Sequence, residues 1–128
     1  MPARVVMVAG CGRADMHELS IMQSALSQAL EEARRAGASR VEEIRLRIGV
    51  LSGVVPDALQ FAFETLAEGT PAEHAALTIE SVPARFWCSA CRQEFESERL
   101  FAECPDCHTA SNELRAGREL ELASLEVV

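Results

Sequence analysis

Apolar positions at helical spacing predict two amphipathic helices. Between Leu19 and Gly37 the apolar residues recur three or four positions apart, so that they share one face of a helix. The S-I-M-Q stretch at 20–23 has the form of a capping box, and Gly37 suits the left-handed residue that ends a helix. Pro56 suits the first turn of a second helix, which Gly69 ends.

Alternating apolar and polar positions predict three strands. Residues 44–50 alternate as a half-buried strand does, and residues 77–82 (LTIESV) form a second strand pattern. The last segment, 117–128 (GRELELASLEVV), also alternates, but its leucines before Ala123 and its apolar residues after Ser124 fall on opposite parity. We therefore expect a bulge or twist near Ala123-Ser124, which would return both sets to one face.

Length and charge limit the class of protein. A chain of 128 residues suits one domain with a small appended module. The formal net charge of −8 argues against a general binder of phosphate backbones. No apolar run approaches the ~20 residues needed to cross a bilayer, and residues 1–15 make a weak signal peptide. We expect a cytoplasmic protein that does not contact membranes.

Four of the five cysteines form two C-x-x-C pairs with metal-ligand spacing. Cys88 and Cys91 are followed, after twelve residues, by Cys104 and Cys107. Two such turns supply four thiolates in a tetrahedral set, the donor set of zinc ribbons and of rubredoxin-like iron sites. We expect the stretch FESERLFAE to form a short hairpin that brings the pairs together, and Phe86, Phe95, Leu100 and Phe101 to cover the site. Cys11 is left over.

Other interpretations of the cysteines and histidines stay open. A C-x-x-C pair also serves in dithiol redox enzymes, although these carry one reactive pair rather than two. A zinc ribbon can also bind nucleic acid or protein, but residues 84–118 hold five arginines against six acids and form no basic stripe. His108 reads as a solvent-facing turn residue or a substitute ligand, and His74 as a surface histidine.

The stretch Met16-His17-Glu18 stands directly before the first helical pattern. It reads either as the first turn of that helix or as a metal site. If the chain began at Met16, a free amine, two amide nitrogens and an imidazole would lie within three residues. Nickel(II) favours such tetragonal, nitrogen-rich coordination.

The predicted fold is α+β: two helices packed on a small mixed β-sheet, with an inserted zinc-ribbon-like module. Residues 16–83 plus 119–128 would form the α/β domain, and residues 84–118 the module. Residues 1–15 form an N-terminal extension outside both parts.

The chain from Met16 to Val128 resembles the HypA/HybF family of nickel metallochaperones. The matching stretches are MHELSIMQSAL at 16–26, RIGVLSGVVPDALQFAFETLAEGT at 47–70, IESVPARFWCSAC at 79–91 and ECPDCHTASNELRAGRELELASLEV at 103–127. C-x-x-C pairs alone are common, but their combination with the M-H-E start and the L-S-G-V passage is specific to this family.

The resemblance implies a carrier without enzymatic activity. It implies Ni(II) as transferred cargo, bound through His17 and backbone nitrogens around Met16 and Glu18. It also implies a structural Zn(II) on the four paired cysteines. The implied partners are a HypB-type maturation GTPase and the large subunit of nickel-iron hydrogenase, with urease in some organisms, for a monomer or weak homodimer. The family motif begins at the initiating methionine. If residues 1–15 are retained, the nitrogen of Met16 is a peptide nitrogen and no longer a free amine donor.

Overall fold

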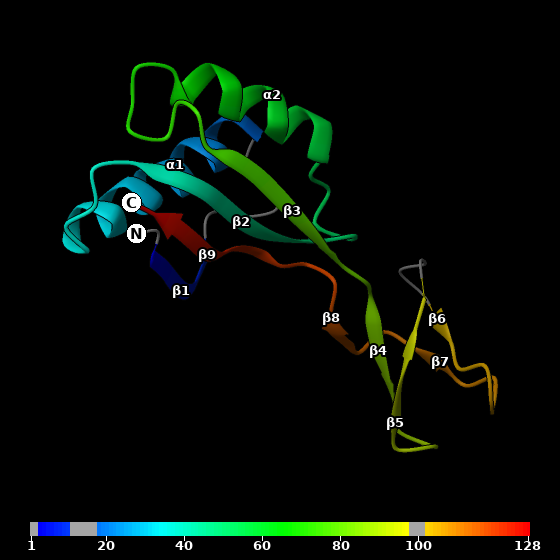
Figure 1. Ribbon diagram of the computed structural model, residues 1–128. Coiled ribbons are helices and arrows are strands. Elements are labelled where there is room, and N and C mark those ends of the chain that lie inside the picture. The colour runs from blue at the N-terminus through cyan, green and yellow to red at the C-terminus, as the bar shows by residue number, and fades with distance from the viewer. Residues whose placement is uncertain (1–2, 11–17, 98–101) are drawn as a thin grey trace.

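The computed structural model of the protein describes residues 3–10, 18–97 and 102–128, which form a larger α/β lobe and a smaller all-β lobe (Figure 1). Its elements, in chain order, are β1 (Ala3–Gly10), α1 (Glu18–Arg35), β2 (Val41–Gly49), α2 (Pro56–Ala67), β3 (Ala76–Val82), β4 (Arg85–Cys88), β5 (Gln93–Glu96), β6 (Ala102–Glu103), β7 (Ala110–Ser111), β8 (Leu114–Ala116) and β9 (Leu120–Val127). The predicted α+β class is confirmed.

The larger lobe is a four-stranded mixed sheet with the order β1-β9-β2-β3. β2 and β3 run parallel because α2 connects them as a crossover, whereas β9 runs antiparallel to both β1 and β2. α1 and α2 contact each other and supply buried residues to one core with β2 and β9. Ile44, Leu46 and Ile48 of β2 point into this core, as their alternation predicted.

The first helix begins earlier than its capping pattern predicted. α1 starts at Glu18, so Ser20 lies inside the first turn and is exposed, and the expected capping box at 20–23 is wrong. An acid in the first turn interacts favourably with the helix dipole, which explains why the helix extends back to Glu18. The predicted end is confirmed: Gly37 has φ +72°, and the N–H of Ala38 donates to the carbonyl of Ala33 at 3.0 Å.

The last strand contains the bulge that its parity predicted. In the ladder with β2, Ser124 lies opposite Arg45 and Leu122 opposite Leu46, so that Ala123 is the additional residue. Its insertion turns the residues on both sides toward the helices. Leu120, Leu122, Leu125 and Val127 are consequently all buried in the core of the larger lobe.

An edge strand in residues 3–10 was not expected from the sequence. β1 pairs antiparallel with β9 from Ala3 opposite Val127 to Gly10 opposite Glu121, with an irregularity between Val6 and Ala9. These residues therefore add a strand to the sheet of the larger lobe, where the sequence indicated only an N-terminal extension.

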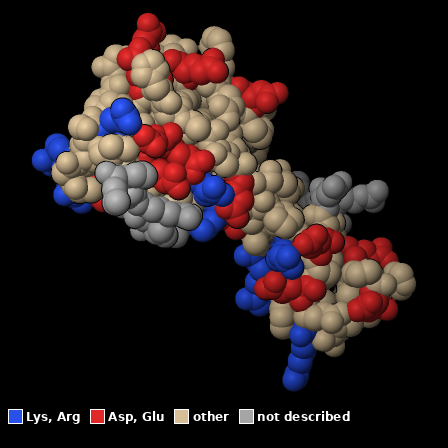
Figure 2. All heavy atoms as spheres, in the orientation of Figure 1, with Lys and Arg blue, Asp and Glu red and all other residues tan. Residues whose placement is uncertain are grey.

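Three chain segments cross closely between the lobes, and we call them the neck: residues 49–51, 82–84 and 117–119. Figure 2 shows the molecule narrowing there. Backbone hydrogen bonds join the segments: Gly49 N–H to the Glu119 carbonyl (2.8 Å), Leu51 N–H to the Gly117 carbonyl (2.7 Å) and Val50 N–H to the Val82 carbonyl (3.0 Å). The smaller lobe is thus connected to the larger one by a hydrogen-bonded crossing of three segments.

Gly49→Ala is expected to destabilise the neck strongly. A Cβ at Gly49 would lie 2.1 Å from the carbonyl carbon and oxygen of Gly117, and a backbone atom cannot yield as a side-chain end can. The free energy of unfolding should fall by about 3 kcal/mol, the upper part of the range for overpacked sites. Denaturant unfolding of the zinc-loaded protein measures this loss.

Gly53→Ala is the matched control for the neck variant. Gly53 has φ +79°, but a Cβ there would meet no atom within 4 Å, so that only backbone strain of about 1 kcal/mol is expected. If the free energy of unfolding fell equally in the two variants, the neck would not require the close backbone approach at Gly49.

Candidate metal centre

Each C-x-x-C pair lies in the turn of its own hairpin. Cys88 ends β4, Cys91 follows in the turn, and β5 begins at Gln93, two residues later. The second pair lies in the turn between β6 and β7, which pair antiparallel. The described residues of FESERLFAE, 95–97 and 102–103, therefore do not form the expected hairpin, because β5 and β6 belong to different sheets.

Both cysteine turns are followed by a left-handed residue at the same position. Arg92, directly after Cys91, has φ 54°, and His108, directly after Cys107, has φ 61°. These are the two non-glycine residues with positive φ among the described part of the chain. Positive φ is uncommon at non-glycine residues and is concentrated at functional sites such as ligand-binding turns. The sequence carries no glycine at either position, so this conformation could not be predicted from it.

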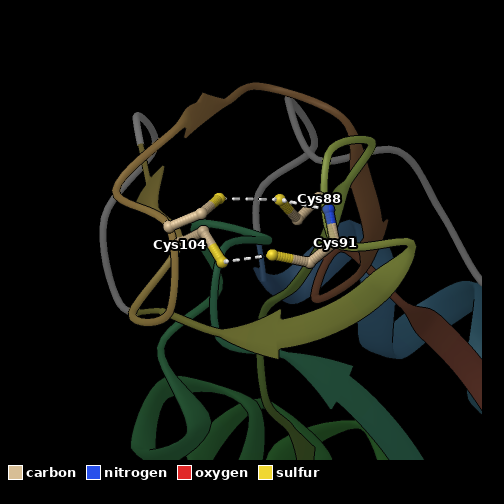
Figure 3. Close-up of side chains that lie close together, drawn as sticks. Cys88, Cys91 and Cys104 are labelled. Atoms are coloured by element: carbon tan, nitrogen blue, oxygen red, sulfur yellow. Dashed lines mark hydrogen bonds between the residues drawn. The ribbon is translucent and has the colours of Figure 1, made fainter.

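The four sulfurs form one cluster, as the spacing predicted. All lie within 4.8 Å of one another. Cys88 Sγ is 3.5 Å from Cys107 Sγ, and Cys104 Sγ is 4.0 Å from Cys91 Sγ (Figure 3). Sulfurs placed ~2.3 Å from a central ion at tetrahedral angles are ~3.8 Å apart. The observed separations lie on both sides of this value, so the donor set fits a tetrahedral zinc ion.

Hydrogen bonds give the cluster one ready thiolate. The hydroxyl and the backbone N–H of Thr109 lower the pKa of Cys107 to about 6. Contact with Cys107 and the other two thiols, together with partial burial, raises the pKa of Cys91 to about 12. Cys107 thus ionises easily, whereas Cys91 resists ionisation. A divalent cation removes that resistance, because it balances the charge of the additional thiolates.

A small apolar core supports the first hairpin and the metal cluster. Phe86 and Phe95 lie opposite each other across β4 and β5, with ring centroids 5.9 Å apart, and both are buried. Cys88 and Cys104 are buried in the same cluster. The expectation that Phe86 and Phe95 cover the site is confirmed, whereas Leu100 and Phe101 lie outside the described residues.

The described histidines are on the surface. His108 is exposed, and its Nδ1 lies 2.9 Å from Glu103 Oε1, which fits the solvent-facing turn residue better than a substitute ligand. His74 is also exposed. Cys11 lies outside the described residues.

The proposed nickel residues are described only from Glu18 onward, since Met16 and His17 lie outside the described residues. The Glu18 carboxylate accepts a hydrogen bond from the N–H of Val55 at 3.2 Å. Val55 is the N-cap residue of α2, and its side chain makes no cap hydrogen bond of its own. Glu18 therefore joins the start of α1 to the start of α2, a contact across 37 residues that local sequence patterns do not reveal.

Nucleic-acid binding gains no support from the smaller lobe. The Arg115 guanidinium lies over the ring of Trp87, 4.9 Å from its centroid, so this face of the aromatic ring is occupied. Acidic and basic side chains are intermixed over the visible face of the lobe (Figure 2). Among the described helices, none is long and apolar enough to cross a membrane.

Comparison with known proteins places the chain among nickel-handling factors. A family model described as "Hydrogenase/urease nickel incorporation, metallochaperone, hypA" matches residues 16–127. A hydrogenase maturation factor from Picosynechococcus is 46% identical over 113 residues, which cover 88% of this chain and 100% of the relative. One from Rhizobium leguminosarum is 42% identical with the same coverage.

Solved structures agree with this placement. The solution structure of a Ni metallochaperone from Helicobacter pylori has a TM-score of 0.63 and 29% identity, and it covers 88% of this chain and 98% of that protein. A second solution structure of the same family has a TM-score of 0.67 and 28% identity, covering 89% of this chain and 98% of that protein.

Proposed function

The chain belongs to the HypA family of nickel-incorporation metallochaperones for hydrogenase maturation, and we propose that it binds Ni(II) at Met16-His17-Glu18. The observation that carries this proposal is the position of the family match, which begins at Met16 and so makes M-H-E its first three residues. An imidazole and neighbouring backbone nitrogens suit the tetragonal coordination that Ni(II) favours.

Glu18 has a positioning role at this site in our proposal. The Val55 N–H donates a hydrogen bond to the Glu18 carboxylate, and this contact fixes the position at which α1 begins. A residue adjacent to His17 is thereby anchored to the rest of the larger lobe. The carboxylate thus positions the nickel site without binding the ion. The donor that we assign to nickel is the backbone nitrogen of Glu18.

We assign a structural zinc ion to Cys88, Cys91, Cys104 and Cys107. Four cysteine ligands complete a tetrahedral shell and leave no open position, which suits a structural rather than a catalytic site. Zinc would hold the two hairpin turns together in a lobe that has only a small core. In our proposal residues 84–118 form this zinc module, and residues 16–83 plus 119–128 form the nickel-binding domain.

The proposed partners follow from the family's role in nickel delivery. They are a HypB-type GTPase and the large subunit of nickel-iron hydrogenase, with urease as a second recipient. The protein would carry nickel in the cytoplasm and would catalyse no reaction itself. The two C-x-x-C pairs fit metal binding in a reducing compartment better than disulfide bonds.

A direct transfer assay tests the proposed function. The nickel-loaded chain beginning at Met16 is mixed with purified nickel-free hydrogenase large subunit, the HypB-type GTPase and GTP. A chelator is present that captures any nickel released into solution. We expect nickel to reach the large subunit faster than from free nickel with the same chelator. Transfer to the chelator alone would favour the alternative, a zinc-ribbon interaction module without a nickel role.

A further inference from the structure

β9 is buried like a strand from the interior of a sheet. Leu122 and Leu125 face the helices, while Ala123 and Ser124 at the bulge are also buried, at 3% and 4% exposure. Burial on consecutive residues indicates that β9 is covered on both faces there. β2 occupies one edge of β9, and β1 occupies the other.

The strand on the outer edge has no counterpart in the family match. The match begins at residue 16, and the relatives from Picosynechococcus and Rhizobium are aligned over their whole length by 113 residues. Residues 3–10 of β1 lie outside that region. In a chain beginning at Met16, the outer N–H and C=O groups of β9 would therefore lose their partner strand. Such an edge is a template for the addition of another strand.

We propose that the outer edge of β9 is a binding site for an extended peptide strand, and that residues 3–10 fill this site within the same chain. The ladder defines the ligand: it runs antiparallel to β9, and it places Arg4 opposite Glu126 and Val5 opposite Leu125. The site therefore takes an apolar segment with a basic residue near its N-terminal end. The proposal concerns the sheet edge and does not depend on nickel binding.

Three proteins and one labelled peptide test this strand-binding site. The peptide is residues 2–10, PARVVMVAG, with a fluorescent label, and its binding is followed by fluorescence anisotropy. The chain beginning at Met16 should bind it with one-to-one stoichiometry, whereas the 128-residue chain should not, because its own strand occupies the edge. The 128-residue chain with Val5→Pro and Val6→Pro should gain binding. Adjacent prolines remove two consecutive N–H groups, one of which must face β9.

A peptide with the same two prolines is the matched control. It should bind the shorter chain at least about tenfold more weakly, since it loses ladder hydrogen bonds while keeping its length and charge. A peptide with Arg4→Glu should also bind more weakly, because it places like charges across from each other at Glu126. Backbone amides of residues 120–127 should exchange hydrogen more slowly when the unmodified peptide is bound.

The results separate clearly. If the chain beginning at Met16 is folded, as its helical circular dichroism would show, and still fails to bind the peptide, the proposal is overturned, because the outer edge of its β9 is free. Equal binding by the shorter and the 128-residue chain would also overturn it, since the peptide would then occupy some other surface.

Discussion

Cys104→Ala should remove the metal from the protein and unfold the smaller lobe, while the larger lobe stays folded. Cys104 is fully buried beside Cys88, and its loss leaves three sulfurs and a cavity in the small core. Metal ligation in such modules contributes on the order of 10 kcal/mol, far more than this core supplies. The larger lobe has a separate apolar core, so its stability should change much less.

Two optical signals distinguish the lobes in this experiment. Trp87 is the single tryptophan and lies on β4, so its fluorescence reports the smaller lobe. Both described helices lie in the larger lobe, so helical circular dichroism reports that lobe. We expect zinc content to fall from about one per chain to near zero, with a shifted tryptophan emission and a preserved helical signal.

Cys11→Ser is the control for the loss of a cysteine. Since the tetrahedral set is complete without Cys11, this variant should retain its zinc and its tryptophan emission. Native Cys104→Ala protein with full zinc content would show that the ligand set is wrong. A simultaneous loss of the helical signal would show instead that the two lobes fold as one unit.

His17→Ala should abolish specific nickel binding in a chain that begins at Met16. The imidazole is the one side-chain donor in our proposed set, and removal of even supporting residues of a metal site costs 10–100-fold in affinity. A loss of more than about 100-fold is therefore expected from a ligand. Calorimetric titration and the nickel absorption spectrum measure the affinity and the coordination geometry.

Chain length should alter the same site. The α-amino group titrates near pH ~7.7–8.0 and gives up its proton to a metal at neutral pH. In the 128-residue chain a peptide nitrogen stands in its place and is much harder to deprotonate, so nickel should bind more weakly. Identical affinity and spectra for the two lengths would show that the amine is not a ligand.

His74→Ala is the matched control for the nickel experiment. His74 is exposed and lies in the segment between α2 and β3, so its replacement should leave nickel affinity unchanged. If His74→Ala and His17→Ala weakened binding equally, nickel would be held by scattered surface histidines rather than at the M-H-E segment.

Local patterns predicted most of the larger lobe because its core positions are periodic. The alternation of Ile44, Leu46 and Ile48 predicts β2, and the change of parity at Ala123 predicts the bulge in β9. The strand in residues 3–10 could not be predicted in the same way. It lacks clear alternation, and its partner strand lies more than a hundred residues further along the chain.

The candidate site also combines features that the local sequence predicts with features that it does not predict. Cysteine spacing predicted the cluster, because two C-x-x-C turns require little more than proximity. The left-handed residues Arg92 and His108 have no glycine to mark them. The hydrogen bond between Glu18 and Val55 depends on the tertiary fold, which places the starts of two helices side by side.

The central position of β9 has a consequence for synthesis of the protein. β9 lies between β1 and β2, and the carbonyl of Val128 accepts hydrogen bonds from the N–H groups of Ser39 and Arg40. β9 follows every other element of the larger lobe along the chain. During translation the larger lobe must therefore remain incomplete until residues 120–127 have emerged from the ribosome, and until then the apolar faces of α1 and β2 stay uncovered.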